Sequence, residues 1–518
     1  MYLTQGLRRS MQQTPHAIAS IYKGRRRTFA ELGDRVARMA GLLRNLGLKP
    51  GDRVGMLALN SDWYVEFYLG VYWAGGVVNP INTRWSPAEI AYSLEDCQTD
   101  ILIVDGNSLN MLADLRSRYP GLRKVLYIGD EPAPQGLLDY EALLAQSTVV
   151  EDALRGGNDL AGIFYTGGTT GVPKGVMLSH SNLYTNAMSM LADRVISPGC
   201  VGLHAAPMFH LADGAFMNAM FAGGGTHVMV PRFEPIAVFE AIQDEGVTES
   251  LLVPTMIQML VDHPAVGKYR LEHFHNMVYG ASPINDALLD RAMKVLPSAG
   301  FTQMYGMTEL SPVATILLQE MHREVGRAKG QHRSNGKATV SCEVRVVDPQ
   351  GNEVPRGEVG EVVVRGPGVM LGYWNKPEVT AATVRDGWMH TGDGGRMDED
   401  GYLYVVDRLK DMIITGGENV YSVEVERAIS LHPAVAVCAV IGVPDPQWGE
   451  LVHALIVKKP GANLEAQEVI DHCKAHIANY KCPRRISFVD EMPMSGAGKI
   501  LKRQLRAPFW ERESRKVS

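Results

Sequence analysis

The hydrophobic positions in the first half of the chain alternate between helical and strand spacing. After Phe29, apolar side chains recur in steps of three and four through Leu46, which predicts an amphipathic helix. Short apolar runs at 52–60 and 100–106, bounded by polar and glycine residues, predict buried strands, and the segment between them has helical spacing and ends in glycines. Strand-like cores recur at 162–166, 251–255 and 277–282. Strands that alternate with helices predict parallel sheets with ligand-binding loops at their C-terminal ends.

The pattern changes beyond about residue 340. The segments EVRVVD, GEVVVRG and GYLYVVD are short β runs separated by turn residues, which predicts a β-rich subdomain at about 340–409. Two more strand-like segments, AVAVCAVIGV and LVHALIVKK, and a helical segment at 464–478 follow. We therefore expect an α/β protein with a large N-terminal domain of helix-flanked sheets at 1–409 and a small α+β C-terminal domain at 410–518.

Composition and charge exclude several classes of protein. The 518 residues are 46% hydrophobic and 21% charged, an ordinary globular composition, and the net charge of −6 argues against general nucleic-acid binding. The six cysteines form no Cys-x-x-Cys pair and have no zinc-ligand spacing, so we expect buried thiols in a reducing compartment. No secretory signal or transmembrane segment is visible, which favours a cytoplasmic protein. The basic run at 25–27 predicts a solvated turn rather than an anion site.

The segment YTGGTTGVPKG at 165–175 has the composition of a phosphate-binding loop. It is not a Walker A loop, because Pro173 precedes Lys174 and Gly175 follows it. Glycines allow backbone N–H groups to converge on phosphate oxygens, threonine hydroxyls add donors, and the lysine adds a positive charge. Taken alone, an ordinary glycine-rich turn also explains the segment. The candidate phosphate-binding residues are Thr166, Gly167, Gly168, Thr169, Thr170 and Lys174.

Two further segments are candidates for nucleotide binding. In MYGMTEL at 304–310, Glu309 is a candidate Mg²⁺ ligand, Thr308 a phosphate donor and Tyr305 a flat face for a base. By itself this segment could equally be a glycine turn that opens a helix at Thr308. In YGASPIN at 279–285, the small residues Gly280, Ala281 and Ser282 would let a planar ring approach the backbone.

The C-terminal part supplies a carboxylate, an arginine and a lysine. Asp393, in the segment GWMHTGDGG, could accept hydrogen bonds from two ribose hydroxyls, and Arg408 offers further donors to ribose or phosphate. Lys499 lies in PMSGAGKILKRQLR, after a glycine-rich turn and before a basic helix. Taken alone, a lysine so close to the end of the sequence is more typical of a solvated side chain.

Together and in this order, these segments resemble the adenylate-forming superfamily of acyl-CoA synthetases, peptide-synthetase adenylation domains and beetle luciferases, and among them the fatty- or aryl-acid CoA ligases. The common family form has serine where this chain has Gly167. The resemblance implies that Lys499 is the adenylation lysine and that Asp393 and Arg408 bind the nucleotide. It further implies that Lys410 is the hinge of a mobile C-terminal domain that acts as a catalytic lid.

The resemblance also implies a reaction. A carboxylate would attack the α-phosphorus of ATP, the loop at 165–175 would hold the departing pyrophosphate, and a thiol would then displace AMP. The expected cofactors are ATP, Mg²⁺ and CoA. For the second step the C-terminal domain would turn about Lys410, and Gly416 and Gly417 would let the pantetheine arm pass, with Trp448 packed against it. Three basic residues could meet the phosphates of CoA or could simply be solvated: Lys474, Lys481 and Arg484.

The sequence limits the class of the acid substrate but does not identify the acid. His210, in PMFHLADG, lies where amino-acid-activating relatives carry aspartate, which disfavours an α-amino acid, although Asp213 keeps that alternative open. His210 is a candidate catalytic residue, and a hydrogen-bonded wall residue of the acid pocket is the alternative interpretation. Medium- or long-chain fatty acids and aryl acids all fit, whereas a dicarboxylate would need an additional cation.

The acceptor is expected to be CoA, because no carrier domain or Asp-Ser-Leu site follows Lys499. A stand-alone enzyme that loads an acyl carrier protein is the alternative. A luciferase-like oxygenase and a non-enzymatic ATP-binding module are further ones. The expected partners are the acid and CoA, and the oligomeric state stays open between a monomer and a homodimer.

Overall fold

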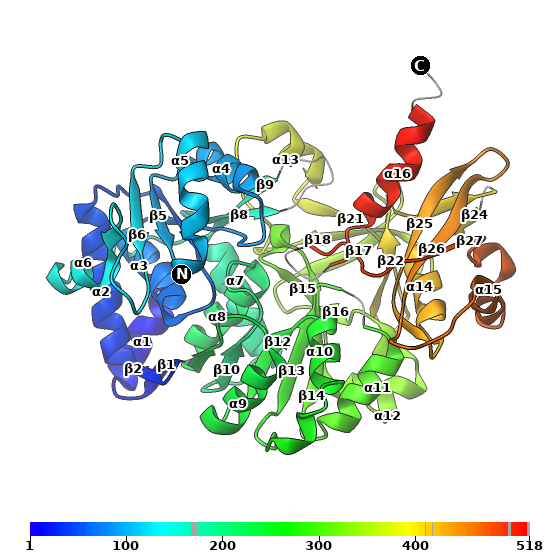
Figure 1. The fold of residues 1–518 in the computed structure, drawn as a ribbon, viewed down its shortest axis with the longest axis horizontal. Helices are drawn as coiled ribbons and strands as arrows, with labels where there is room; N and C mark the ends of the chain where they lie inside the picture. Colours follow the sequence, from blue (N-terminus) through cyan, green and yellow to red (C-terminus); the bar gives the residue numbers. More distant parts are fainter. Residues whose placement is uncertain (167–172, 283, 410, 417, 496–498, 515–518) are drawn as a thin grey trace.

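The computed structural model describes residues 1–166, 173–282, 284–409, 411–416, 418–495 and 499–514, and it has four sheets (Figure 1). The first has the strand order β19-β9-β8-β4-β3-β5-β6-β7. Its strands are β3 (Arg53–Leu57), β4 (Val77–Pro80), β5 (Ile101–Val104), β6 (Lys124–Tyr127), β7 (Leu138–Asp139), β8 (Leu160–Thr166), β9 (Lys174–Ser179) and β19 (Gly372–Tyr373). Neighbouring helices are α1 (Gln5–Gln13), α2 (Phe29–Asn45), α3 (Asp62–Ala74), α4 (Pro87–Asp96), α5 (Leu112–Arg118), α6 (Tyr140–Gln146) and α13 (Pro377–Thr383).

The second large sheet has nine strands in the order β16-β15-β14-β13-β12-β10-β11-β1-β2. They are β1 (Ile18–Tyr22), β2 (Arg25–Thr28), β10 (Val201–His204), β11 (Thr226–Met229), β12 (Glu249–Leu252), β13 (Asn276–Gly280), β14 (Gly300–Gly306), β15 (Val313–Leu317) and β16 (Lys337–Ala338). The helices in this part of the chain are α7 (His180–Ala192), α8 (Leu211–Gly223), α9 (Pro235–Glu245), α10 (Pro254–Val261), α11 (Asp286–Val295) and α12 (Glu324–Ala328). Side chains of α7 and α8 belong to the core clusters of both large sheets, so these two helices are packed between them.

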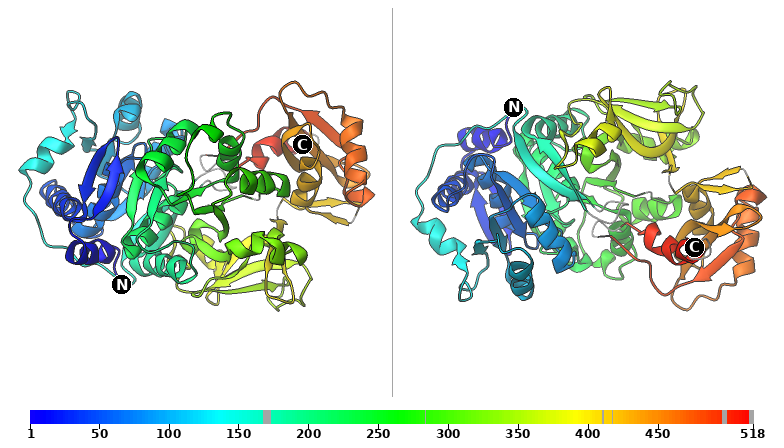
Figure 2. Two further views of the ribbon diagram at one scale, coloured as in Figure 1. Left: turned by 90° about the horizontal axis from the view of Figure 1, so that it is seen from below. Right: turned by 90° about the horizontal axis from the view of Figure 1, so that it is seen from above.

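Two smaller sheets complete the fold. The β-rich sheet predicted from about residue 340 contains β17 (Glu343–Val347), β18 (Gly360–Arg365), β20 (Val384–Arg385), β21 (Trp388–Met397) and β22 (Leu403–Arg408). The last sheet has β23 (Ile413–Thr415), β24 (Glu418–Val420), β25 (Val435–Asp445), β26 (Gly449–Lys458) and β27 (Arg485–Phe488), with α14 (Ser422–Ser430), α15 (Ala466–Lys474) and α16 (Lys502–Ser514). The orange-to-red C-terminal part lies at one end of the molecule in all three views (Figures 1 and 2). The predicted mixed α/β class, with a large N-terminal and a small C-terminal domain, is confirmed.

The central strands of both large sheets are parallel, as predicted. The strands that carry the motifs at 165–175 and 304–310 are instead each paired with an antiparallel strand. β8 pairs with β9, and β14 pairs with β15, in antiparallel registers. The segment at 165–175 therefore connects two antiparallel strands rather than a strand and a helix. The predicted strand at 251–255 ends at Leu252, because Pro254 starts α10.

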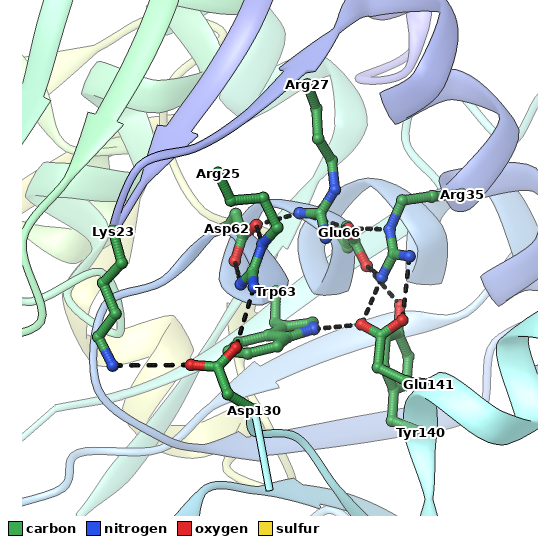
Figure 3. A network of polar contacts seen from close by, with 10 residues as sticks. All are labelled: Lys23, Arg25, Arg27, Arg35, Asp62, Trp63, Glu66, Asp130, Tyr140 and Glu141. Atoms are coloured by element: carbon green, nitrogen blue, oxygen red, sulfur yellow. Dashed lines mark hydrogen bonds and ion pairs between the residues drawn. The ribbon is translucent and has the colours of Figure 1, made fainter. Parts of the chain in front are cut away.

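The basic run at 25–27 is not a solvated turn, which corrects the prediction. Arg25 and Arg27 both pair with Asp62 (Figure 3). Arg26 pairs with Glu245. The Arg25 Nε–Asp62 Oδ2 distance is 2.7 Å. The network continues through Glu66 to Arg35 and Tyr140. Since the two central carboxylates are buried, their arginine partners are needed to offset the cost of desolvation.

Within the described part of the chain, no helix is both long and apolar enough to cross a membrane.

Candidate active site

The phosphate-loop residues that the structure describes lie at the ends of two paired strands. Thr166 ends β8, Lys174 begins β9, and the two residues are register partners. The Nζ atom of Lys174 lies 4.7 Å from the centroid of the Tyr373 ring, a cation–π contact. The candidates Gly167, Gly168, Thr169 and Thr170 lie outside the described residues.

Glu309 lies on a single 3₁₀ turn, Thr308–Leu310, and not at the start of an α-helix. Its side chain is buried, with the residue 6% exposed. The Tyr373 hydroxyl donates to Glu309 Oε1 at 2.8 Å, and no other described residue donates to this carboxylate. The Met370 backbone N–H also donates to the Glu309 carbonyl at 2.9 Å. Glu309 is therefore oriented through one carboxylate oxygen, while the second stays available to a ligand.

The residues proposed for ribose and base form one hydrogen-bonded group. Asp393 in β21 is the register partner of Arg408 in β22, and Arg408 Nε lies 2.6 Å from Asp393 Oδ1. The Tyr305 hydroxyl donates to Asp393 Oδ2 at 2.7 Å. Burial and the nearby Asp393 charge raise the pKa of Tyr305 well above its ordinary value, so its hydroxyl remains a donor. The structure thus brings together two predicted motifs that lie far apart in the sequence.

Gly280, Ala281 and Ser282 lie at the end of β13, beside the strand that leads to Tyr305. Gly280 is the register partner of Met304, and a Cβ atom at Gly280 would lie 2.5 Å from the Met304 carbonyl oxygen. Ala281 has a φ of 67°. The close approach of the two strands requires glycine at position 280. The small residue there therefore has a structural reason in addition to the predicted one, the approach of a planar ring.

Lys499 comes from the C-terminal domain and is electrostatically coupled to side chains of the N-terminal one. Lys499 is itself an exposed residue. Desolvation and the Arg408 charge lower the pKa of Lys499, whereas Asp393 and Glu309 oppose that shift. Lys499 also acts on His210, whose pKa is lowered to about 4, first by burial and then by the lysine charge. Five predicted site residues therefore converge: Lys499, His210, Arg408, Asp393 and Glu309.

The lowered pKa of Lys499 predicts the pH dependence of acyl-AMP formation. Because the protonated amine is the useful form, activity should be lost as the pH rises through the pKa of Lys499, which lies below the ordinary value of 10.5. The measurement is kcat/KM for acyl-AMP formation as a function of pH. In Lys499→Arg this alkaline limb should move to higher pH, because guanidinium does not titrate there. An identical alkaline limb in both proteins would assign it to another group.

Comparison with known proteins agrees with this arrangement. The model for AMP-binding enzymes matches residues 7–374, and the model for the C-terminal domain of AMP-binding enzymes matches 424–499. The chain belongs to the AMP-binding enzyme family. It is an ATP-dependent, AMP-forming ligase, and the resemblance identified from the motifs is confirmed.

Relatives in this family differ in the acid and in the acceptor. A feruloyl-CoA synthase from Amycolatopsis sp is 38% identical over 97% of this chain and 98% of its own length. A fatty acid–[acyl-carrier-protein] ligase, ScoC, from Streptomyces coeruleorubidus is 34% identical over 98% and 96% of the two chains. The structure of an anthranilate CoA ligase, AuaEII, in complex with anthranoyl-AMP has a TM-score of 0.91 and 27% identity, over 99% and 98% of the two chains.

Asp213 is bonded to a histidine in the interior of this AMP-binding enzyme. It is fully buried, and its Oδ1 atom lies 2.7 Å from His204 Nδ1. His204 Nε2 in turn lies 3.0 Å from His227 Nδ1. The sequence left an α-amino acid substrate possible because of the Asp213 carboxylate, and this carboxylate is bonded to another side chain inside the protein. Two nearby glycines have structural roles, since Gly224 caps α8 and a Cβ at Gly225 would lie 2.9 Å from the Cys200 carbonyl oxygen.

The candidate CoA residues of the C-terminal domain are partly brought together. Gly416 has a φ of 59°, donates its N–H to the Trp448 carbonyl at 2.8 Å, and lies against the indole, which a Cβ would approach to 2.8 Å. The Arg484 guanidinium lies 4.0 Å from the Trp448 ring centroid. Lys474 and Lys481 instead pair with Asp471 and Glu424. The predicted hinge Lys410 and the second glycine, Gly417, lie outside the described residues.

An ion pair between described residues joins the C-terminal domain to the rest of the molecule. Arg427 of α14 lies 2.8 Å from Asp286 of α11, which also pairs with Arg333. The two arginine charges lower the pKa of Asp286, against the effect of burial. These contacts help to hold the domains in the arrangement in which Lys499 approaches the other site residues.

The sequence did not identify Tyr373 as a site residue. It lies in LGYWNKPE, a segment with no periodic or compositional signal for binding, and it reaches Glu309 only through the tertiary fold.

Proposed function

We propose that this enzyme is an acyl-CoA synthetase that joins an apolar carboxylic acid to CoA through an acyl-AMP intermediate. The observation that carries the proposal is the placement of Lys499 within electrostatic range of His210, Glu309, Asp393 and Arg408. This arrangement brings a positive charge of the C-terminal domain within electrostatic range of the residues proposed to bind ATP. It fits adenylation, in which negative charge must be stabilised between an acid and the α-phosphate.

In the first step, a carboxylate oxygen of the acid attacks the α-phosphorus of ATP, the bond to the bridging oxygen breaks, and pyrophosphate leaves. Lys499 stabilises the charge that develops on the α-phosphate and the carboxylate. Asp393 and Arg408 bind the ribose and phosphate, with Tyr305 and the 280–282 segment along the adenine. The two departing phosphates are bound by the loop between β8 and β9 together with Thr166, Lys174 and Thr308.

Glu309 is the proposed Mg²⁺ ligand. Mg²⁺ is commonly held by one or two carboxylates together with substrate phosphates, and it would supply charge neutralisation to the phosphate chain. The buried Glu309 carboxylate, with one oxygen bonded to Tyr373 and the other without a described donor, fits that need. Among the described residues no group of three or more His, Cys, Asp or Glu side chains could hold a metal, which is compatible with a metal that binds together with ATP.

In the second step, the thiol sulfur attacks the carbonyl carbon of acyl-AMP, AMP leaves, and the thiol proton passes to solvent or to a base. We propose CoA as the thiol. The Gly416 backbone lies against the Trp448 ring, and the Arg484 guanidinium adds a positive charge beside that ring, which suits the pantetheine arm and the phosphates of CoA. Rotation of the C-terminal domain about Lys410 would bring this surface to the acyl-AMP.

The acid is proposed to be an aryl acid or a medium- to long-chain fatty acid. Burial lowers the pKa of His210 to about 4, so the imidazole is neutral near pH 7 and suits a hydrogen-bonding wall rather than an ion pair. The buried Asp213 removes the carboxylate that an amino-acid substrate would use. The 38% identity to a feruloyl-CoA synthase supports the aryl class.

The test is mass spectrometry of reactions that contain ATP, Mg²⁺ and a mixed panel of aryl, fatty, amino and dicarboxylic acids, with and without CoA. We expect one aryl or fatty acid to form acyl-AMP without CoA, and acyl-CoA with release of AMP when CoA is present. Trp448→Ala should raise KM for CoA and leave acyl-AMP formation unchanged. An amino acid or dicarboxylate as the only substrate would contradict the acid class.

The alternative acceptor is an acyl carrier protein, which the 34% identity to a fatty acid–[acyl-carrier-protein] ligase supports. It predicts that acyl-AMP persists when CoA is added and is consumed only when a phosphopantetheinylated carrier protein is supplied. In that case Trp448→Ala would leave acyl-AMP formation unchanged, and acyl-AMP would persist with CoA in the variant as it does in the wild type.

A further inference from the structure

Tyr373 is fixed on the strand next to Lys174 by its own backbone. It belongs to β19, the edge strand beside β9, where it is the register partner of Val176. The neighbouring residue, Trp374, donates its N–H to the Gly175 carbonyl at 2.8 Å. The Tyr373 N–H donates to the Thr380 hydroxyl at 2.9 Å. The position of the ring relative to the phosphate loop is therefore set by the sheet rather than by the side chain alone.

The Tyr373 side chain contacts both charged residues on the phosphate side of the site. Its hydroxyl donates to Glu309 Oε1, and the face of its ring lies 4.7 Å from Lys174 Nζ. The residue is 4% exposed.

A lysine and a glutamate this close to one side chain would attract each other. A direct salt bridge between Lys174 and Glu309 would neutralise the charge proposed to meet phosphate and occupy the carboxylate proposed to meet a cation. A ring between them attracts the ammonium through its face without removing its charge. Its hydroxyl occupies only one oxygen of the carboxylate and leaves the other free to bind.

We propose that Tyr373 is a positioning residue that keeps Lys174 and Glu309 apart and aims each at a different part of the Mg²⁺–ATP complex. The inference rests on the proposed roles of Lys174 and Glu309. It assigns the hydroxyl to the cation side of the site and the ring to the phosphate side. The two functions of the side chain can therefore be separated by substitution.

The test compares Tyr373→Phe, which keeps the ring, with Tyr373→Leu, which removes both contacts. The matched control is Tyr140→Phe. Tyr140 is also a buried tyrosine that donates to a buried glutamate, at 2.7 Å to Glu66 Oε2, but it lies in the remote ion-pair network of Figure 3. Both phenylalanine variants lose one hydrogen bond of the same kind, so a purely structural effect should appear equally in both.

Two measurements follow for each variant. The first is the Mg²⁺ concentration that gives half-maximal acyl-AMP formation. It should rise roughly tenfold in Tyr373→Phe, the change expected when a hydrogen bond to a charged group is lost, and stay unchanged in Tyr140→Phe. The second needs no turnover: the rise in melting temperature caused by α,β-methylene-ATP, measured with Mg²⁺ and with EDTA.

In Tyr373→Phe, we expect the Mg²⁺-dependent part of the thermal shift to fall and the part seen with EDTA to stay. In Tyr373→Leu both parts should fall. In a Glu309→Gln background, Tyr373→Phe should have little further effect, because the two residues act together. A wild-type Mg²⁺ response in Tyr373→Phe, or the same loss in Tyr140→Phe, would overturn the proposal.

The binding measurement also separates this inference from the proposed function. If no acid in the panel is adenylated, the proposed activity fails, but the nucleotide shift still reports on Tyr373. If an acid is adenylated and the Mg²⁺ response of Tyr373→Phe is that of the wild type, only the positioning role fails.

Discussion

Replacing Lys499 with alanine should lower the rate of acyl-AMP formation by about 10²-fold or more, while ATP still binds. The amine is the group of the C-terminal domain that is electrostatically coupled to His210, Asp393 and Glu309. Its charge would be needed most in the transition state, when negative charge builds on the α-phosphate. Ground-state binding of ATP is shared among several other residues, so it should weaken much less.

Acyl-AMP formation is measured by pyrophosphate release in a single turnover, and ATP binding by the thermal shift with α,β-methylene-ATP. Lys474→Ala is a suitable control, because Lys474 is an exposed lysine of the same domain that pairs with Asp471. Thioester formation from chemically prepared acyl-AMP should survive in Lys499→Ala, since that step does not use the lysine in the proposed mechanism. Adenylation at the wild-type rate in this variant would remove Lys499 from the mechanism.

Local sequence signals were sufficient for most of the fold. The helix predicted after Phe29 spans Phe29–Asn45, and Thr28 and Glu31 form a capping box at its start. The strand predicted at 251–255 ended early because proline favours the first turn of the next helix. The antiparallel return of β9 against β8 had no local signal, because it depends on pairing between strands rather than on the periodicity of either one.

The residues of the candidate site also differ in whether a local sequence signal could point to them. Glu309, Asp393 and Lys499 could be selected as candidates because each lies in a contiguous motif of distinctive composition. Tyr373 could not be selected in this way, because its proposed role depends on Glu309, which is 64 positions away in the sequence. Asp213 was kept as a possible substrate contact because only the fold reveals that it is buried against His204. The motifs alone could not predict which side chains are buried or which residues far apart in the sequence form pairs.

Gly306→Ala is expected to destabilise the protein and to displace Glu309. A Cβ atom at Gly306 would lie 1.8 Å from the Pro312 carbonyl oxygen, far inside any permitted contact. That same carbonyl accepts the Met307 N–H at 2.9 Å and so closes the turn that carries Glu309. A methyl group would force the two backbone segments apart, at a cost of roughly 1–3 kcal/mol or more, as for other overpacked sites.

The consequence should be visible in both stability and activity. The melting temperature should fall, and the protein that remains folded should form acyl-AMP more slowly and need more Mg²⁺, because the Glu309 carboxylate has moved with the turn. Gly267→Ala is the matched control: a Cβ there would meet nothing within 4 Å. Gly306→Ala could instead have the melting temperature and activity of the wild type. In that case the ends of β14 and β15 would accommodate the methyl group without moving Glu309. The turn would then not be what positions the Glu309 carboxylate. A fall in melting temperature with an unchanged Mg²⁺ requirement would assign Gly306 to packing alone, and would leave the Tyr373 hydroxyl as the contact that holds Glu309 in place.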